Sequence, residues 1–155
     1  MKQHNLLYRS LCGLVTIEDF EADSVPIFRN PDYVPGTSIV VDAQRVMGFN
    51  FGFTEMRNFV QRTVLRLEAR NAAVNILFVG DRLIGNSIAS MFKCFTDIQE
   101  TLISVYTDFD LEEVFAYLDL PSSIVNKLTT CRMSADVVCP EGSPCCLTRE
   151  LGRMF

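Results

Sequence analysis

Two polar segments that follow strand-like runs are best placed to bind a ligand. They are Asp42, Gln44 and Arg45 after one run, and Asp81, Arg82, Asn86 and Ser87 after the next. Open α/β sheets bind ligands at the carboxyl ends of parallel strands, so we expect these side chains to face one crevice for a ligand or partner. Asn86 or Ser87 would cap the following helix, whose first N–H groups also bind anions. Helix capping and loop solvation explain the same residues without a ligand.

The C-terminal segment carries a group of cysteines whose spacing is C-x7-C-x5-C-C. They are Cys131, Cys139, Cys145 and Cys146. Structural zinc sites usually pair their cysteines as C-x2–4-C, and this spacing lacks such a pair. We therefore expect incidental thiols, or a disulfide formed on oxidation, and no cofactor; a metal site is the weaker alternative. Cys12 and Cys94 lie in apolar segments, which predicts that both are buried.

Residues for covalent or acid–base catalysis are poorly represented. His4 is the single histidine and lies at the N-terminus, where chain ends fray. A Ser-His-Asp or Cys-His arrangement would need it. Glu112 and Glu113 form a carboxylate pair, but the dipole at the start of a helix explains them. We predict that the chain is not an enzyme and has no catalytic residues.

Three phenylalanines alternate with glycine and asparagine in an otherwise loop-like segment. Phe49, Phe51 and Phe53 belong to Met47-Gly-Phe-Asn-Phe-Gly-Phe53. Packing against the core is the favoured interpretation of such residues. The alternative is an apolar surface that acts as a lid over a pocket or as a contact in a homodimer.

Four strand-like runs, each followed by a helix-like run, must position these residues. The runs are Asn5–Cys12, Ser38–Ala43, Val74–Gly80 and Thr101–Thr107. Parallel strands need long crossovers, so four βα units predict an α/β fold with a mainly parallel sheet flanked by helices.

The first three helices are expected to begin near Ile17, at Thr54 as an N-cap, and at Asn86 or Ser87. Pro26 should interrupt the first of them, with Ser24 capping a short new turn. Asp110 should cap the fourth helix, which Pro121 ends. A further helix to about Cys131 and an irregular tail should follow.

Composition and charge narrow the function classes. The 155 residues suggest one main domain, and 48% apolar against 21% charged residues is typical of a globular protein. The net charge is −5 and the basic residues are scattered, which argues against nucleic-acid binding. No secretory signal and no apolar run of about 18 residues is present, so we expect a cytoplasmic protein without a transmembrane segment.

Several motifs together resemble the small bacterial SpoIIAA-like proteins, which are grouped with STAS and Sec14-type domains. They are Gly13-Leu-Val-Thr16, the Pro31–Gly36 loop, Val41-Asp-Ala43, Gly85-Asn-Ser-Ile-Ala-Ser-Met-Phe92 and Asp110-Leu-Glu-Glu-Val-Phe-Ala-Tyr-Leu118. The likeness covers about residues 5–120. It implies either protein-partner binding, as in anti-sigma-factor antagonists, or apolar-ligand binding, as in Sec14 relatives. The phosphorylatable Asp-Ser-x-Gly of STAS antagonists is replaced here by Asp42-Ala43-Gln44.

These observations predict a SpoIIAA-like α/β domain over residues 1–121 and a C-terminal extension, a helix plus a Cys-rich arm, over residues 122–155. The expected function is a non-enzymatic regulatory module that binds a protein partner without a STAS phosphoacceptor. The alternative is a carrier of a lipid or another apolar small ligand.

Overall fold

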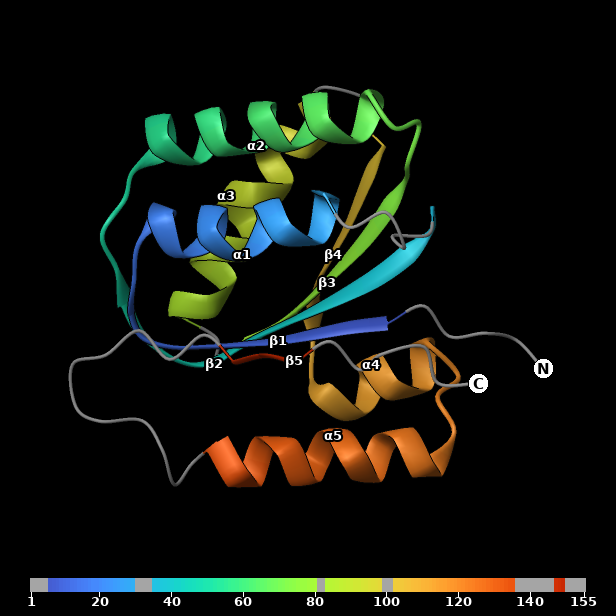
Figure 1. Ribbon diagram of the computed structural model, residues 1–155. Coiled ribbons are helices and arrows are strands. Elements are labelled where there is room, and N and C mark those ends of the chain that lie inside the picture. Colours follow the sequence, from blue (N-terminus) through green and yellow to red (C-terminus); the bar gives the residue numbers. More distant parts are fainter. Residues whose placement is uncertain (1–5, 30–34, 81–82, 99–101, 136–146, 150–155) are drawn as a thin grey trace.

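A sheet of parallel strands forms the centre of the molecule (Figure 1). The computed structural model describes residues 6–29, 35–80, 83–98, 102–135 and 147–149. The parallel strands are β1 (Leu6–Val15), β2 (Thr37–Phe49), β3 (Val74–Val79) and β4 (Ile103–Phe109). Their order is β4-β3-β2-β1, and a short strand, β5 (Leu147–Arg149), pairs antiparallel with the free side of β1. The predicted α/β fold of βα units is confirmed.

Helices cover both faces of the sheet (Figure 1). The crossover helices α1 (Ile17–Arg29), α2 (Phe53–Glu68) and α3 (Ile84–Ile98) lie on one face, and α4 (Leu111–Tyr117) and α5 (Ser122–Ala135) lie on the other. Since each strand pairs with the next one along the chain, right-handed crossovers place all three connecting helices on the same side. No helix in these described ranges is long and apolar enough to cross a membrane.

The alternation of strand side chains divides the core into two clusters. Ile39, Val41 and Ile76 pack under α1, α2 and α3. Val40 and Leu77, their neighbours in sequence, pack against Val114 of α4, Leu128 of α5 and other residues of those helices. Strands buried on both faces read as continuous β-branched and apolar runs, which explains the composition of β2 and β3.

Strand β2 is longer than predicted, because it continues past Ala43 to Phe49. Its pairing with β1 continues through Arg45, Val46 and Gly48, across two register shifts at each of which β2 contains one more residue than β1. Gly13 lies at one of these shifts with φ 69°, a conformation that glycine adopts without strain. The shifted register keeps β1 and β2 paired beyond Ala43, although the residues of β2 there no longer alternate regularly between apolar and polar. The predicted loop is therefore strand up to Phe49.

Three predicted helix starts or breaks are wrong. α1 continues through Pro26, and Ser24 lies within it, donating its hydroxyl to the carbonyl oxygen of Phe20. α2 begins at Phe53 and not after a Thr54 cap, since the backbone N–H of Gly52 bonds to Oε2 of Glu55 at 3.0 Å. α3 begins at Ile84, so Asn86 and Ser87 lie inside its first turn.

The predicted cap of α4 is confirmed and gives a first testable prediction. Oδ1 of Asp110 accepts from the Glu113 backbone N–H at 2.8 Å, and Oε2 of Glu113 accepts from the Asp110 backbone N–H at 2.9 Å. Asp110→Ala removes one half of this reciprocal cap and should lower the free energy of unfolding by about 1 kcal/mol in urea. The control is Glu112→Ala in the same exposed turn, with an expected loss below about 0.5 kcal/mol. Equal losses would contradict a capping role.

Candidate ligand-binding pocket

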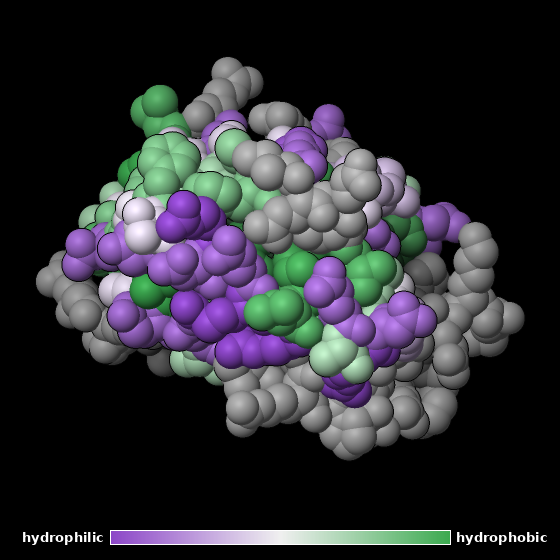
Figure 2. Space-filling view, turned by 90° about the horizontal axis from the view of Figure 1, so that it is seen from above, coloured by the Kyte–Doolittle hydropathy of each residue, from purple (hydrophilic) through white to green (hydrophobic). Residues whose placement is uncertain are grey.

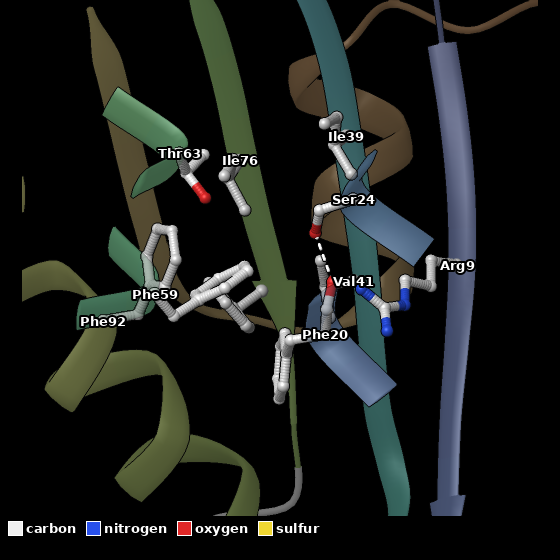
Figure 3. Close-up of a pocket in the computed structure, with 10 residues that line it drawn as sticks. Arg9, Phe20, Ser24, Ile39, Val41, Phe59, Thr63, Ile76 and Phe92 are labelled. Carbon is white, nitrogen blue, oxygen red and sulfur yellow. Dashed lines mark hydrogen bonds between the residues drawn. The ribbon is translucent and has the colours of Figure 1, made fainter. Parts of the chain in front are cut away.

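A small cavity lies between the sheet and the crossover helices (Figure 3). Its volume is about 40 Å³. Each of β1, β2, β3, α1, α2 and α3 contributes to its wall. The lining residues are Arg9, Phe20, Ser24, Ile39, Val41, Phe59, Thr63, Ile76, Phe78 and Phe92.

Simple periodicities bring these residues together. Ile39 and Val41, like Ile76 and Phe78, are two apart in a strand and therefore share one face of the sheet. The pairs Phe20 and Ser24, and Phe59 and Thr63, are four apart in α1 and α2 and so share one side of each helix. The strands form the floor of the pocket, and the helices form its roof.

Phenylalanine rings account for much of the apolar wall. Phe92 lies with its ring centroid 6.2 Å from that of Phe59 and 5.8 Å from that of Phe78. Phe20 lies 5.7 Å from Phe59. Phe51 packs edge-on against the far side of this group, 5.8 Å from Phe20. Tilted and edge-on arrangements are the favoured geometries of aromatic pairs, so these contacts favour the observed ring orientations around the pocket.

One wall of this apolar pocket carries a buried positive charge. Arg9 is 4% exposed and reaches from β1 beneath α1 (Figure 3). Its Nη2 donates to the carbonyl oxygen of Asp19 at 2.8 Å, and its guanidinium carbon lies 5.1 Å from the ring centroid of Phe20. The backbone bond and the cation–π contact hold the guanidinium in place at the pocket.

Two hydroxyl groups also line the pocket, and they differ in their bonding. The Ser24 hydroxyl is occupied by the Phe20 carbonyl. Thr63 is 1% exposed, and its Oγ1 has no hydrogen-bond partner in the described part of the chain. The same is true of the buried Nη1 of Arg66, one helical turn further along α2. A buried hydroxyl without a partner costs about 1–3 kcal/mol, so Oγ1 of Thr63, which lines the pocket, is where a ligand would gain most.

The predicted crevice residues of β2 lie elsewhere. Asp42 is 2% exposed, and it lies in the middle of β2 because the strand continues to Phe49. Its Oδ2 accepts from the Tyr8 hydroxyl at 2.6 Å, on the α4 and α5 face of the sheet, and its Oδ1 accepts from the Gln44 backbone N–H at 3.0 Å. Gln44 and Arg45 are half-buried within the same strand, with Nη2 of Arg45 3.4 Å from Oγ of Ser10.

The predicted crevice residues around α3 are only partly described. Asp81 and Arg82 lie outside the described residues. Asn86 is half-buried, and the exposed Ser87 donates its hydroxyl to the Leu83 carbonyl at 2.7 Å. Because α3 and the Asp42 carboxylate lie on opposite sides of the sheet, the structure does not bring Asp42 and the α3 residues into one site.

The phenylalanine segment is divided between core and surface. Phe49 and Phe51 are half-buried, pack against the cluster under the crossover helices, and lie 5.0 Å apart between ring centroids. Phe53 is 65% exposed, and its ring lies 6.1 Å from that of Phe95. Core packing is thus observed for the first two residues. Phe51 is not among the described residues that line the pocket, but its ring contacts Phe20, which is.

The cysteine predictions are tested only in part. Cys12 is buried, as expected, whereas Cys94 is exposed, because it lies on the outer side of α3. The side chain of Cys131, together with Cys139, Cys145 and Cys146, lies outside the described residues. Within the ranges that are described, no three metal-ligating side chains lie together.

Two pocket residues were missed although the sequence contains a signal for each. Arg9 lies between Leu7 and Leu11 at the inward-facing positions of β1, where a charge is unusual. Thr63 interrupts the apolar side of α2 between Phe59 and Leu67. A polar residue at a position whose periodicity predicts burial is the signal that indicates such a site.

Comparisons with protein-family models, with curated proteins and with solved structures found no match to this chain. The resemblance to SpoIIAA-like proteins therefore rests on the quoted motifs alone.

Proposed function

We propose that this protein is a non-enzymatic binding module that takes a small, mainly apolar ligand into the pocket under α1, α2 and α3. The observation that supports it most is the cavity itself, about 40 Å³ in volume and lined mainly by apolar side chains. Among the described residues that line the pocket there is no histidine, cysteine, aspartate, glutamate or lysine. Such a wall suits binding better than acid–base or nucleophilic chemistry.

The volume limits the ligand. A cavity needs about 10–15 Å³ for each water-sized group, so about three such groups fit into 40 Å³. A complete acyl chain would require α1 or α2 to move away from the sheet. Of the two apolar ligand types that the sequence suggests, we therefore favour a small molecule over a lipid.

Xenon, a small apolar probe, tests this proposal through the methyl resonances of the two sheet faces. Xenon under pressure should shift the methyl signals of Ile39, Val41 and Ile76, which line the pocket. The methyl groups of Val40 and Leu77 on the opposite face provide an internal control and should not move. Equal shifts on both faces, or no shift on either, would refute a binding pocket. Ile76→Phe should fill the cavity and abolish the shifts.

A protein partner is the second candidate, supported by exposed apolar side chains at the carboxyl edge of the sheet. These residues, which we call the apolar rim, are Leu14, Met47, Phe53 and Leu83, each at least 59% exposed. Figure 2 shows hydrophobic side chains at the upper left, above a hydrophilic area, at the end where α2 begins in Figure 1. Apolar side chains that gather on one edge are typical of a contact surface.

A second copy of the chain is the partner that can be tested directly. Sedimentation should then give a dimer, and Met47→Lys in the rim should dissociate it. Leu65→Lys is the matched control, because Leu65 is 65% exposed on α2 but lies outside the rim. A monomer at all concentrations would exclude the homodimer.

A further inference from the structure

A single hydroxyl group in the pocket indicates the chemistry of the ligand more narrowly than the cavity volume does. We infer that the pocket binds a neutral two-carbon molecule with one terminal oxygen, of which ethanol is the simplest. The ligand oxygen bonds to Oγ1 of Thr63, and the hydrocarbon body lies beside the rings of Phe59 and Phe92. The inference rests on the proposed function and adds the chemical class of the ligand.

The Thr63 hydroxyl differs in its bonding from other hydroxyl groups in the described helices. Serine and threonine in a helix commonly donate to the carbonyl oxygen four residues earlier, and Ser24, Ser87 and Thr129 do so. Oγ1 of Thr63 has no hydrogen-bond partner among the described residues, although Phe59 lies four residues earlier in the same helix. Both the donor and the acceptor capacity of this hydroxyl are therefore available to a ligand.

The position of the Thr63 hydroxyl makes the cavity the place where such a ligand would bond. Thr63 is 1% exposed, so the hydroxyl does not face bulk water. Its side chain lines the cavity, and in Figure 3 its oxygen points from α2 toward the strands, on the side of Ile76. A ligand oxygen would remove the cost of a buried hydroxyl without a partner, whereas a wholly apolar ligand would leave that cost in place. The pocket should therefore select a ligand with a terminal oxygen.

The size of the ligand follows from the cavity volume. About 40 Å³ holds about three water-sized groups, which allows one oxygen and two carbon atoms. A carboxylate group fills that space by itself and leaves no room for a hydrocarbon body. A buried ion also needs several hydrogen bonds or a paired charge to offset its lost hydration, and one hydroxyl group does not supply them. We therefore expect a neutral ligand.

The apolar part of the wall sets the orientation of the ligand. Phe59 lies one helical turn before Thr63 in α2, and its ring centroid is 6.2 Å from that of Phe92. Ile39 and Ile76 contribute the adjoining part of the wall from the strands. With its oxygen at Thr63, the ligand therefore places its two carbon atoms against these rings and methyl groups.

Ethanol and propane form a matched pair for testing the inference, because each has three heavy atoms and only ethanol has an oxygen. Ethanol should shift the methyl signals of Ile39 and Ile76 saturably. Its Kd should be about 1 mM or weaker, because so few heavy atoms limit the affinity. Propane under pressure should shift the same signals. The methyl signals of Val40 and Leu77, on the opposite face of the sheet, should not move with either ligand.

Thr63→Val tests the hydroxyl contact, since it removes the hydroxyl group and keeps the shape of the side chain. Ethanol should bind about 5–10-fold more weakly to this variant, whereas propane should bind at least as tightly as to the wild type. The control is Thr96→Val. Thr96 is 2% exposed on α3, its hydroxyl donates to the Lys93 carbonyl, and it is not among the described residues that line the pocket. This control should bind both ligands as the wild type does.

Nuclear Overhauser effects in the wild-type protein test the orientation without any substitution. The methylene group of bound ethanol should lie closer to the methyl group of Thr63 than the ethanol methyl group does. The ethanol methyl group should instead give its strongest effects with the rings of Phe59 and Phe92. The reverse orientation would overturn the inference, because the oxygen would then be remote from Thr63.

Three further results would overturn the inference. Unchanged ethanol affinity in Thr63→Val would show that the hydroxyl does not bind the ligand. Equal losses of ethanol and propane affinity would show that only the shape of the wall has changed, and propane shifts without ethanol shifts would show that the pocket rejects the oxygen. In each case, propane shifts confined to the pocket of the wild type would still support the proposed function. The absence of shifts with ethanol, propane and xenon would refute both the inference and the proposed function.

Discussion

Replacing Phe92 with alanine is expected to lower the free energy of unfolding by about 4 kcal/mol. Phe92 is 2% exposed and its ring lies 6.2 Å from that of Phe59 and 5.8 Å from that of Phe78, so its removal takes one ring contact from α2 and one from β3. The new space joins a cavity that is already about 40 Å³. The surrounding structure therefore cannot recover the lost contacts without moving α3.

Urea unfolding measures this loss, and Phe53→Ala is the matched control. Phe53 also makes an aromatic contact, with Phe95 at 6.1 Å, but it is 65% exposed. Its replacement should change the free energy of unfolding by less than about 0.5 kcal/mol. The enlarged cavity of Phe92→Ala should also take up benzene, which would raise the melting temperature of this variant only. A loss below about 1.5 kcal/mol would mean that α3 collapses into the space and that the cavity is not rigid.

The fold was predictable because its signals are local and agree with one another. The apolar β-branched run Ile39-Val40-Val41 predicts a strand buried on both faces, and the clusters on both faces confirm it. Asp110 with Glu113 predicts a helix start, and the reciprocal hydrogen bonds confirm that too. Each of these features depends on neighbours within a few residues.

The errors arose where pairing between distant segments decides the structure. Gln44 and Arg45 interrupt the apolar run, so the sequence indicates that β2 ends there, yet pairing with β1 continues past them to Phe49. Pro26 indicates a break, but α1 continues to Arg29, and the buried Phe20 and Ser24 hold the part of the helix before the proline against the sheet. Tertiary contacts of this kind have no local pattern.

The pocket could be predicted only in part for a related reason. Periodicity places Phe59, Phe92 and the β2 and β3 residues on the correct faces, but a cavity is a volume that the side chains fail to fill. The cavity depends on how three strands and three helices pack together, and the sequence of no single element predicts that packing. The sequence marks Arg9 and Thr63 only as polar residues at positions whose periodicity predicts burial.

Replacing Tyr8 with phenylalanine should remove a short, buried polar contact on the opposite face of the sheet. The Tyr8 hydroxyl donates to Oδ2 of Asp42 at 2.6 Å, and the two side chains are 5% and 2% exposed. A hydrogen bond to a buried carboxylate is worth about 1.5–3 kcal/mol, and Tyr8→Phe removes the donor while it keeps the ring that packs among Val40 and Leu77. We expect a loss of about 2 kcal/mol in the free energy of unfolding.

Two comparisons decide whether that loss comes from the bond between β1 and β2. Tyr117→Phe removes a hydroxyl from a tyrosine that is 52% exposed and should cost less than about 0.5 kcal/mol. In the double variant with Asp42→Asn, the losses should be smaller than the sum of the single losses, because both changes weaken the same contact. Additive losses would show that Tyr8 and Asp42 act independently and that the carboxylate is held by its other partners, among them the Gln44 N–H at 3.0 Å. Asp42 would then be a feature of β2 alone, and its burial would owe nothing to the pairing with β1.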